Sequence, residues 1–400
     1  MKGLFLGAGA SYELGMPLVT ELSAIFRRDH FPEIVREASI SLQWSSDAAD
    51  TLIELLADEE LHYEAIIGAF EVMGQRRGPP ANSYDGIRKH LVDMVYRYLI
   101  SQHSQKKKFT LQGLKYLEGL RRFSNKDEPL RIFSLNHDLM VEEICSSIGL
   151  PLKAGFHPKS EYCASCFDGA KIDYEFEVIT EQQMADGQYD FFQPGEFGVN
   201  LYKLHGALDT FLFRDCKDYI RFTPRQTHLG EHIQHIVDIH NASHKLEVED
   251  GVRMVGLLTL KDSRGDVQFF DRSLITGAFK FQRQGGERKN GLAVMFERFM
   301  SDIYFVTELT CIGYGFGDLH VNEVLAKWLC SSSDNKLTIV DPFMRCLPGF
   351  MLHLKPQIRV VNETFLEFVS APSVDTLEKR LALHIHQQIR EFGRKEHFKK

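Results

Sequence analysis

Polar residues and glycines follow several short apolar runs in this 400-residue chain, in positions where they could bind a nucleotide. Residues 2–6 (KGLFL) lead into Gly7-Ala8-Gly9-Ala10-Ser11, and a helical pattern begins near residue 20. A glycine-rich turn between a strand and a helix lets the backbone approach a pyrophosphate and directs amide N–H groups at its charge. The third glycine comes only at Gly15-Met16-Pro17, so this turn alone is also consistent with an ordinary strand-to-helix connection.

Further apolar runs also end in residues that can bind a ligand. Residues 130–135 are followed by Asn136-His137-Asp138, and residues 199–204 are followed by His205-Gly206. Open parallel sheets bind ligands in the crevice at the carboxyl ends of their strands, so these polar side chains are candidates for one site. Each also has an ordinary explanation, Asn136 as a turn residue and His205 as a hydrogen-bonded core histidine.

Two later runs extend the pattern. Residues 303–312 are followed by Gly313-Tyr314-Gly315-Phe316-Gly317-Asp318, and residues 337–341 end in Asp341. Alternate glycines let a ligand lie against the backbone, whereas Asp318 could equally do no more than cap a helix that begins near His320. Asp341 is a natural acceptor for a ribose hydroxyl. Five such strand ends in succession favour a shared nucleotide site.

The same runs predict the elements that would position these residues. Short apolar runs separated by long segments with helical periodicity are typical of parallel strands joined by crossovers. We therefore expect an α/β fold with a doubly wound (Rossmann-like), mostly parallel sheet and a large helical insertion at about 20–128. The predicted strands are 2–6, 130–135, 199–204, 303–312, 337–341 and 358–361, and helical patterns cover 18–28, 48–73, 84–100 and 374–393.

Residues 1–345 are expected to form one domain, which residues 346–400 complete with a strand and an amphipathic helix. An irregular insertion at about 151–198 contains Cys163-x-x-Cys166, and the glycine-rich, charged segment 282–291 predicts a surface loop. The stretch 84–100 carries a stripe that we expect to face the core, made of Ile87, Leu91, Met94, Val95 and Leu99.

The composition excludes several classes of protein. A chain that is 44% hydrophobic, 26% charged and 11% aromatic is globular, and it contains no apolar run of roughly 18 residues that would predict a membrane span. The net charge of −8 disfavours a dedicated nucleic-acid-binding protein, so clusters such as Lys106-Lys107-Lys108 and Arg121-Arg122 are interpreted as solvated faces. Seven scattered cysteines indicate a reducing compartment, and we expect a cytoplasmic protein.

Taken together, the motifs resemble the NAD-binding domain of sirtuins, and more closely the sirtuin-like NADases of bacterial anti-phage defence. The resemblance extends over about residues 1–345. It rests on segments in the same chain order, which are Gly7 to Ser11 with Gly15-Met16-Pro17, Asn136-x-Asp138, Leu204-His205-Gly206 and Gly313 to Asp318.

The resemblance implies a role for each of these residues. Asn136 would orient the attacking water and the ribose, and His205 would bind a ribose hydroxyl and take its proton, which suits a group with a pKa near ~6.5. Asp138 would contact the nicotinamide carboxamide. NAD would be bound as the substrate by Gly7, Ala8, Gly9, Ala10, Ser11, Met16, Pro17, His137, Asp138, Gly313, Gly315, Asp318 and Asp341.

The chain departs from protein-deacylating sirtuins in three places. Their Asp-Phe-Arg after Gly-x-Pro is replaced by Leu18-Val19-Thr20, and the glutamine before their asparagine is replaced by Leu135. One Cys-x-x-Cys pair with an isolated Cys216 does not supply the four ligands of a structural zinc ion, so we expect no metal. These differences remove the acyl-lysine machinery and leave the NAD motifs.

The expected function is therefore an NAD glycohydrolase that releases nicotinamide and ADP-ribose, acting in anti-phage defence (abortive infection) by NAD depletion. The resemblance also implies a homo-oligomer and a separate protein partner such as a HerA-type ATPase. Two alternatives stay open at this point. One is a non-catalytic module that senses NAD or ADP-ribose and gates a partner, and the other is an NAD-dependent protein deacylase.

A competing motif is found at His228-x-x-Glu231-His232, which has the residue order of inverted zinc proteases. A glycine lies inside this segment, and no downstream glutamate stands out as a third ligand. The histidines over 232–240 therefore favour a helix with a histidine-rich surface.

Overall fold

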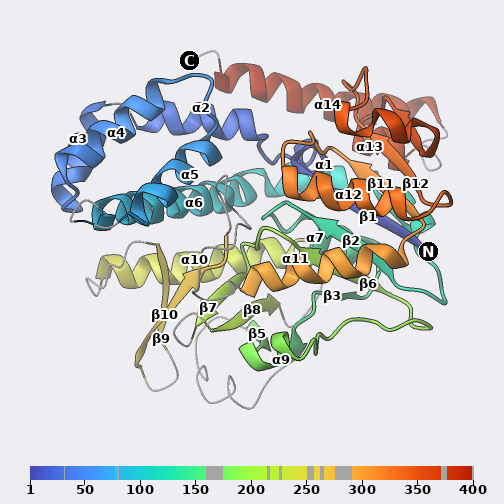
Figure 1. Ribbon diagram of the computed structural model, residues 1–400, viewed down its shortest axis with the longest axis horizontal. Coiled ribbons are helices and arrows are strands. Elements are labelled where there is room, and N and C mark those ends of the chain that lie inside the picture. Colours follow the sequence, from blue (N-terminus) through green and yellow to red (C-terminus); the bar gives the residue numbers. More distant parts are fainter. Residues whose placement is uncertain are drawn as a thin grey trace.

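The computed structural model describes residues 1–30, 32–76, 78, 81–158, 174–213, 217–224, 228–249, 256–261, 265–274, 291–370 and 376–398. A seven-stranded sheet lies at its centre, and all of its strand pairs are parallel (Figure 1). In spatial order the strands are β13 (Ile358–Val361), β12 (Lys336–Val340), β11 (Glu308–Ile312), β1 (Lys2–Leu6), β2 (Leu130–Ser134), β6 (Val199–Lys203) and β3 (Leu152–Lys153). The α/β class with a parallel sheet agrees with the sequence prediction.

The order of the strands creates a switch point between β1 and β11. The chain runs from β1 to β2, β3 and β6 on one side, and then returns to β11, β12 and β13 on the other side. The crossovers diverge at this pair, which is where open α/β sheets leave a crevice beyond the strand ends. β2 and β6 are buried along their whole length, as expected of parallel strands covered on both faces.

One predicted strand begins later than the sequence analysis expected. In the run 303–312, residues Ile303–Phe305 form a short 3-10 turn (η2), and β11 begins only at Glu308. Ile303 and Val306 are fully buried in the apolar cluster beside β11, so their hydrophobicity reflects packing of a turn and not strand pairing. β3, inside the predicted irregular region, was not predicted.

The chain between β1 and β2 is helical. Its elements are α1 (Ala8–Tyr12), α2 (Val19–Asp29), α3 (Pro32–Ser41), α4 (Ser46–Ala57), α5 (Tyr63–Gly74), α6 (Ala81–Leu114) and the 3-10 helix η1 (Glu118–Phe123). The single predicted stretch 48–73 is in fact two helices, because the backbone leaves the helical region at Asp58 and His62 caps α5 through the Ala65 N–H. The stripe predicted on 84–100 is buried except for Met94, which is half-buried.

A second sheet was not predicted from the sequence. It is antiparallel, with the order β4 (His157–Pro158), β5 (Tyr174–Ile179), β8 (Asp218–Pro224), β7 (Thr210–Phe213), β10 (Val267–Arg272) and β9 (Leu257–Lys261). Its strands are short and several are only half-buried, so their apolar runs are too interrupted to stand out. Cys163, Cys166, Cys216 and residues 282–290 lie outside the described part of the chain.

Helices cover both sheets and complete the fold (Figure 1). They are α7 (Met140–Ile148), α9 (Glu181–Ala185), α10 (Glu231–Glu249), α11 (Gly291–Asp302), α12 (Leu319–Ser331), the 3-10 helix η3 (Gly349–Gln357), α13 (Phe365–Ser370) and α14 (Leu377–Phe398). The predicted helix over 374–393 corresponds to α14. None of the helices in the described ranges combines the length and the apolar character needed to span a membrane.

Candidate active site

A cleft of about 1050 Å³ lies at the carboxyl ends of the parallel strands, at the switch point. This volume is slightly above the roughly 300–1,000 Å³ typical of ligand pockets. Every predicted site residue lines it except Ala10 and Ser11, which are buried behind its wall. Those that line it are Gly7, Ala8, Gly9, Met16, Pro17, Asn136, His137, Asp138, His205, Gly313, Gly315, Asp318 and Asp341.

The glycines of the first turn are needed for contact with another stretch of backbone. The Gly9 N–H donates to the Gly313 carbonyl at 2.9 Å, and the Gly7 N–H donates to Ile312 at 3.0 Å. A Cβ added at Gly7 would lie 2.5 Å from the Gly313 oxygen, and Gly313 itself has a φ of +63°. The two turns therefore fit together only because neither carries a side chain at these points.

This packing leaves few backbone N–H groups of the first turn to bind a pyrophosphate. The N–H groups of Gly7, Gly9 and Ala10 all donate to carbonyls of the protein, and the five-residue helix α1 follows at once. Within the described residues, the Ala8 N–H is the one amide of residues 7–10 left for a ligand. By contrast, a Cβ at Gly315 or Gly317 would meet open space, so the second glycine turn offers more room beside its backbone.

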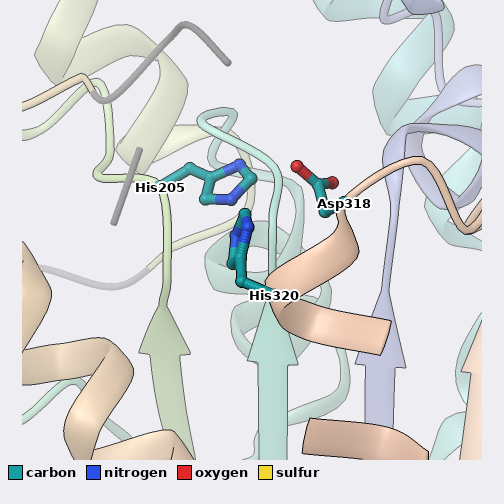
Figure 2. Close-up of side chains that lie close together, drawn as sticks. All are labelled: His205, Asp318 and His320. Atoms are coloured by element: carbon teal, nitrogen blue, oxygen red, sulfur yellow. The ribbon is translucent and has the colours of Figure 1, made fainter. Parts of the chain in front are cut away.

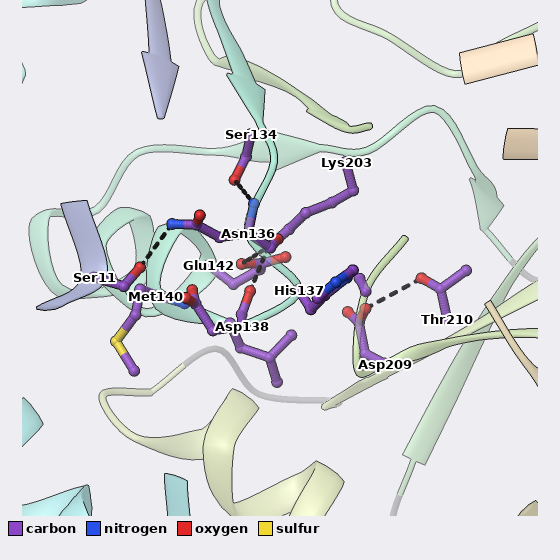
Figure 3. A network of polar contacts seen from close by, with 12 residues as sticks. Ser11, Ser134, Asn136, His137, Asp138, Met140, Glu142, Lys203, Asp209 and Thr210 are labelled. Atoms are coloured by element: carbon purple, nitrogen blue, oxygen red, sulfur yellow. Dashed lines mark hydrogen bonds and ion pairs between the residues drawn. The ribbon is translucent and has the colours of Figure 1, made fainter. Parts of the chain in front are cut away.

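Asn136 joins the end of β2 to the first turn. Its Nδ2 donates to the Gly7 carbonyl and to the Ser11 Oγ, both at 2.9 Å, and the side chain is buried (Figure 3). Ser11, predicted to bind the cofactor, instead holds Asn136 in place. Ala10 is part of the apolar core.

A buried lysine forms hydrogen bonds with the backbone of residues 136–138. The Lys203 Nζ, at the end of β6, donates to the Asp138 carbonyl and, at 3.4 Å, to the Asn136 carbonyl (Figure 3). It also forms an ion pair with Glu142 at 3.4 Å. The Asp138 carboxylate accepts the N–H of Met140, the first residue of α7, at 3.1 Å. Lys203 was not predicted as a site residue, because a lysine at the end of an apolar strand has no distinctive pattern.

His103, on α6, supports the same segment. The Leu139 N–H donates to its Nε2 at 3.3 Å, and the ring is fully buried. Burial lowers the pKa of His103 to about 4, so the ring is neutral and can accept this hydrogen bond at physiological pH.

We expect His103 to make the protein less stable as the pH falls from about 6.5 to about 4. In this window the unfolded histidine, with a pKa of 6.5, binds a proton that the folded one does not, so unfolding becomes easier as the pH falls. Above this window the effect is absent. The shift corresponds to roughly 3 kcal/mol at its full extent.

Urea unfolding at pH values from 4 to 7.5 measures this effect. His103→Gln keeps an acceptor for the Leu139 N–H but does not titrate, so its stability should depend on pH less steeply than that of the wild type, by up to one proton. Equal slopes for the two proteins would contradict the prediction.

His205 lies in the cleft with two residues that begin α12. It is buried, and its ring centroid is 6.3 Å from that of His320. Figure 2 shows both rings and the Asp318 carboxylate directed toward a common point, and their donor atoms lie within 4.8 Å of one another. His320 was considered only as a helix position in the sequence analysis, since its proximity to His205 depends on the return of the chain to the other side of β1.

Two nitrogens and one carboxylate are a ligand set that divalent transition metals accept. A metal ion bound there would take one ring nitrogen of His205 as a ligand, and that nitrogen could then not accept a proton. The protease-like motif forms no such cluster. α10 begins at Glu231, so His228 precedes the helix and does not share a helical face with His232. His232 is itself buried, and burial lowers its pKa to about 4. Among the described residues, the His205–Asp318–His320 group is the one set with metal-ligand spacing.

Arg221, on β8, links the second sheet to α7. Its guanidinium contacts Asp209 at 2.7 Å, Glu177 at 3.2 Å and Glu142 at 3.5 Å, and it is buried. Burial would raise the pKa of Asp209, but the charges of Arg221 and Lys203 outweigh it and lower that pKa. The Glu142 bound by Lys203 is thus fixed from both sheets.

The cleft mouth is formed by parts of the chain that the sequence analysis did not connect with the site. Phe343 and Leu319 are 86% and 78% exposed, although both line the cleft. The Asp341 carboxylate accepts the Phe343 N–H at 2.7 Å, so it shapes the loop as well as facing the cleft. On the other side, Arg390 of α14 donates to the carbonyls of Tyr12 and Met16.

A scan against protein-family models and a search of curated proteins find no match to this chain.

Proposed function

We propose that this cleft binds NAD and hydrolyses the bond between nicotinamide and ribose, giving nicotinamide and ADP-ribose. The observation that carries the proposal is convergence. Asn136 and Asp138 follow β2 and His205 follows β6, and all three line one cleft with the packed turns at Gly7 and Gly313. The sequence resemblance assigns these same residues to NAD hydrolysis.

In the proposed reaction the bond from ribose C1′ to the nicotinamide nitrogen breaks, and nicotinamide leaves as a neutral molecule. Positive charge develops on the ribose, and water adds to C1′ with loss of a proton. Asn136 orients this water and the ribose, and His205 takes a proton from a ribose hydroxyl. The ribose oxygen then takes up the proton that the water loses, so one proton in all is released, through His205. The carboxylate of Asp318 faces the His205 ring and stabilises its protonated form.

The other parts of the cleft suit the rest of the dinucleotide. The Ala8 N–H and the open space beside Gly315 and Gly317 can accommodate a pyrophosphate that lies close to the backbone. Asp341 can accept a ribose hydroxyl, and the exposed ring of Phe343 next to it can cover a base. In this proposal the enzyme acts in the cytoplasm as an effector of anti-phage defence.

Release of nicotinamide from NAD by the purified full-length protein tests the proposal. The protein is incubated with NAD at 1 mM, and nicotinamide and ADP-ribose are separated by chromatography. We expect both products in equal amounts with no acyl-lysine peptide present. Binding of NAD or ADP-ribose without any nicotinamide would overturn the proposed hydrolysis.

That second outcome would support a sensing module instead. One observation favours this alternative. The Asn136 amide nitrogen donates both of its hydrogen bonds to other groups of the protein, Gly7 and Ser11. In a sensor, Asn136 would have only this structural role.

A further inference from the structure

α14 carries a row of exposed apolar side chains along its outer face. Their exposed fractions are 84% for Leu377, 56% for Leu381, 49% for Ile385, 54% for Ile389 and 67% for Phe392. Spacings of four and three residues place them on one face of a helix. Figure 1 shows α14 along the outer edge of the molecule, next to α2 and α13. An ordinary surface helix has polar side chains on this face.

The opposite face of α14 packs against the rest of the protein. The exposed apolar row is therefore not the core-facing side of a helix turned outward. His386 stacks on Phe109 with 4.1 Å between ring centroids, and its Nε2 contacts the Glu13 carbonyl at 3.0 Å. Arg390 also forms an ion pair with Glu21 at 3.1 Å. Leu383, on this side, is buried. One face of α14 therefore packs against the rest of the protein, and the opposite face exposes apolar side chains to which another molecule could bind.

The exposed area fits a protein interface. With side chains of about 200 Å² each, the exposed fractions leave roughly 600 Å² of apolar surface, whereas a standard interface buries roughly 800 Å² per partner. The largest apolar patch of a monomer is about 300–600 Å² and is often functional.

The charges at the two ends of the row indicate what covers it. Glu378 lies beside the row at its N-terminal end, and Lys395 lies on the same face at the C-terminal end. If a second α14 is laid against the first in the antiparallel direction with Leu381 opposite Phe392, Glu378 of each copy lies opposite Lys395 of the other. The row and its charges are therefore complementary to themselves, as a two-fold interface requires.

We propose that the protein forms a homodimer through its α14 helices, paired antiparallel with Leu381 against Phe392 and Glu378 against Lys395. The inner face of the same helix lines the cleft through Gln387, Arg390 and Glu391. The dimer would thus hold in place the helix that supports the first turn of the site. The interface itself does not depend on the proposed hydrolysis.

Sedimentation of the full-length protein at 1 to 50 µM tests the interface, with a charge exchange to identify its direction. The wild type should be a dimer. Glu378→Lys and Lys395→Glu should each weaken dimerisation at least tenfold. Each change places two like charges opposite each other, and the two-fold symmetry repeats this repulsion at both ends of the interface. The double variant E378K/K395E should recover an affinity within threefold of the wild type. Leu381→Glu should give a monomer.

Lys327→Glu on α12 is the matched control, since this lysine is also exposed and forms an ion pair with Glu323 at the surface. It should leave the dimer unchanged. A wild type that is monomeric at 50 µM would overturn the proposal, and so would a dimer that both single charge variants leave intact. A double variant that stays monomeric would overturn the antiparallel arrangement.

Discussion

Replacement of His205 by alanine is expected to lower the rate of nicotinamide release at least about 100-fold, because general acid–base groups contribute roughly 10²–10⁴-fold. The ring is buried in the cleft beside Asp318 and His320. The measurement is single-turnover release of nicotinamide at saturating NAD. Circular dichroism and the unfolding midpoint show that the variant is folded.

His244→Ala is the matched control for this variant. His244 lies on α10, outside the cleft, with 59% of its side chain exposed. Its removal should change the rate less than twofold. Activity that survives in His205→Ala at more than a tenth of the wild-type rate would contradict the proposed role of this histidine.

Asn136→Ala should also abolish turnover, but this variant loses structural hydrogen bonds as well. Two buried bonds are removed, at about 1 kcal/mol each. Ser11→Ala removes one of these partners and leaves the amide in place, so it measures the structural part separately. If both variants lose stability and activity in proportion, Asn136 acts only as a support of the first turn.

Gly313→Ala is expected to lower the free energy of unfolding by at least about 3 kcal/mol. A Cβ at this position would lie 2.4 Å from the Ala10 nitrogen, which is backbone and cannot move aside, and the residue has a φ of +63°. The same clash would separate the first turn from the end of β11, so NAD binding should be lost too. Urea unfolding measures the first effect and calorimetric titration with NAD the second.

Gly317→Ala is the stability control in the same turn. A Cβ at this position meets no atom within 4 Å, and φ is not positive, so the change should cost less than about 1 kcal/mol. Equal losses in the two variants would show that the close contact of the turns at Gly313 does not determine stability.

The sequence identified those elements whose local pattern reflects their burial. β1, β2, β6 and β12 are short runs rich in apolar residues because both faces of a parallel sheet are covered, and such runs are easy to recognise in a sequence. The polar residues that follow them had to lie at one edge of the sheet. The antiparallel sheet was missed because half-exposed strands such as β10 mix polar and apolar residues without a clear period.

The residue types that follow the strands can be read from the local pattern, and they indicated the class of fold and part of the cleft lining. Which groups these residues contact depends on the tertiary structure. It showed that Gly7 and Gly313 pack against each other, that Ser11 binds Asn136, and that His320 joins His205. The reason is physical. Local pattern follows from burial within one element, whereas these contacts join residues more than a hundred positions apart and depend on the order of strands in the sheet.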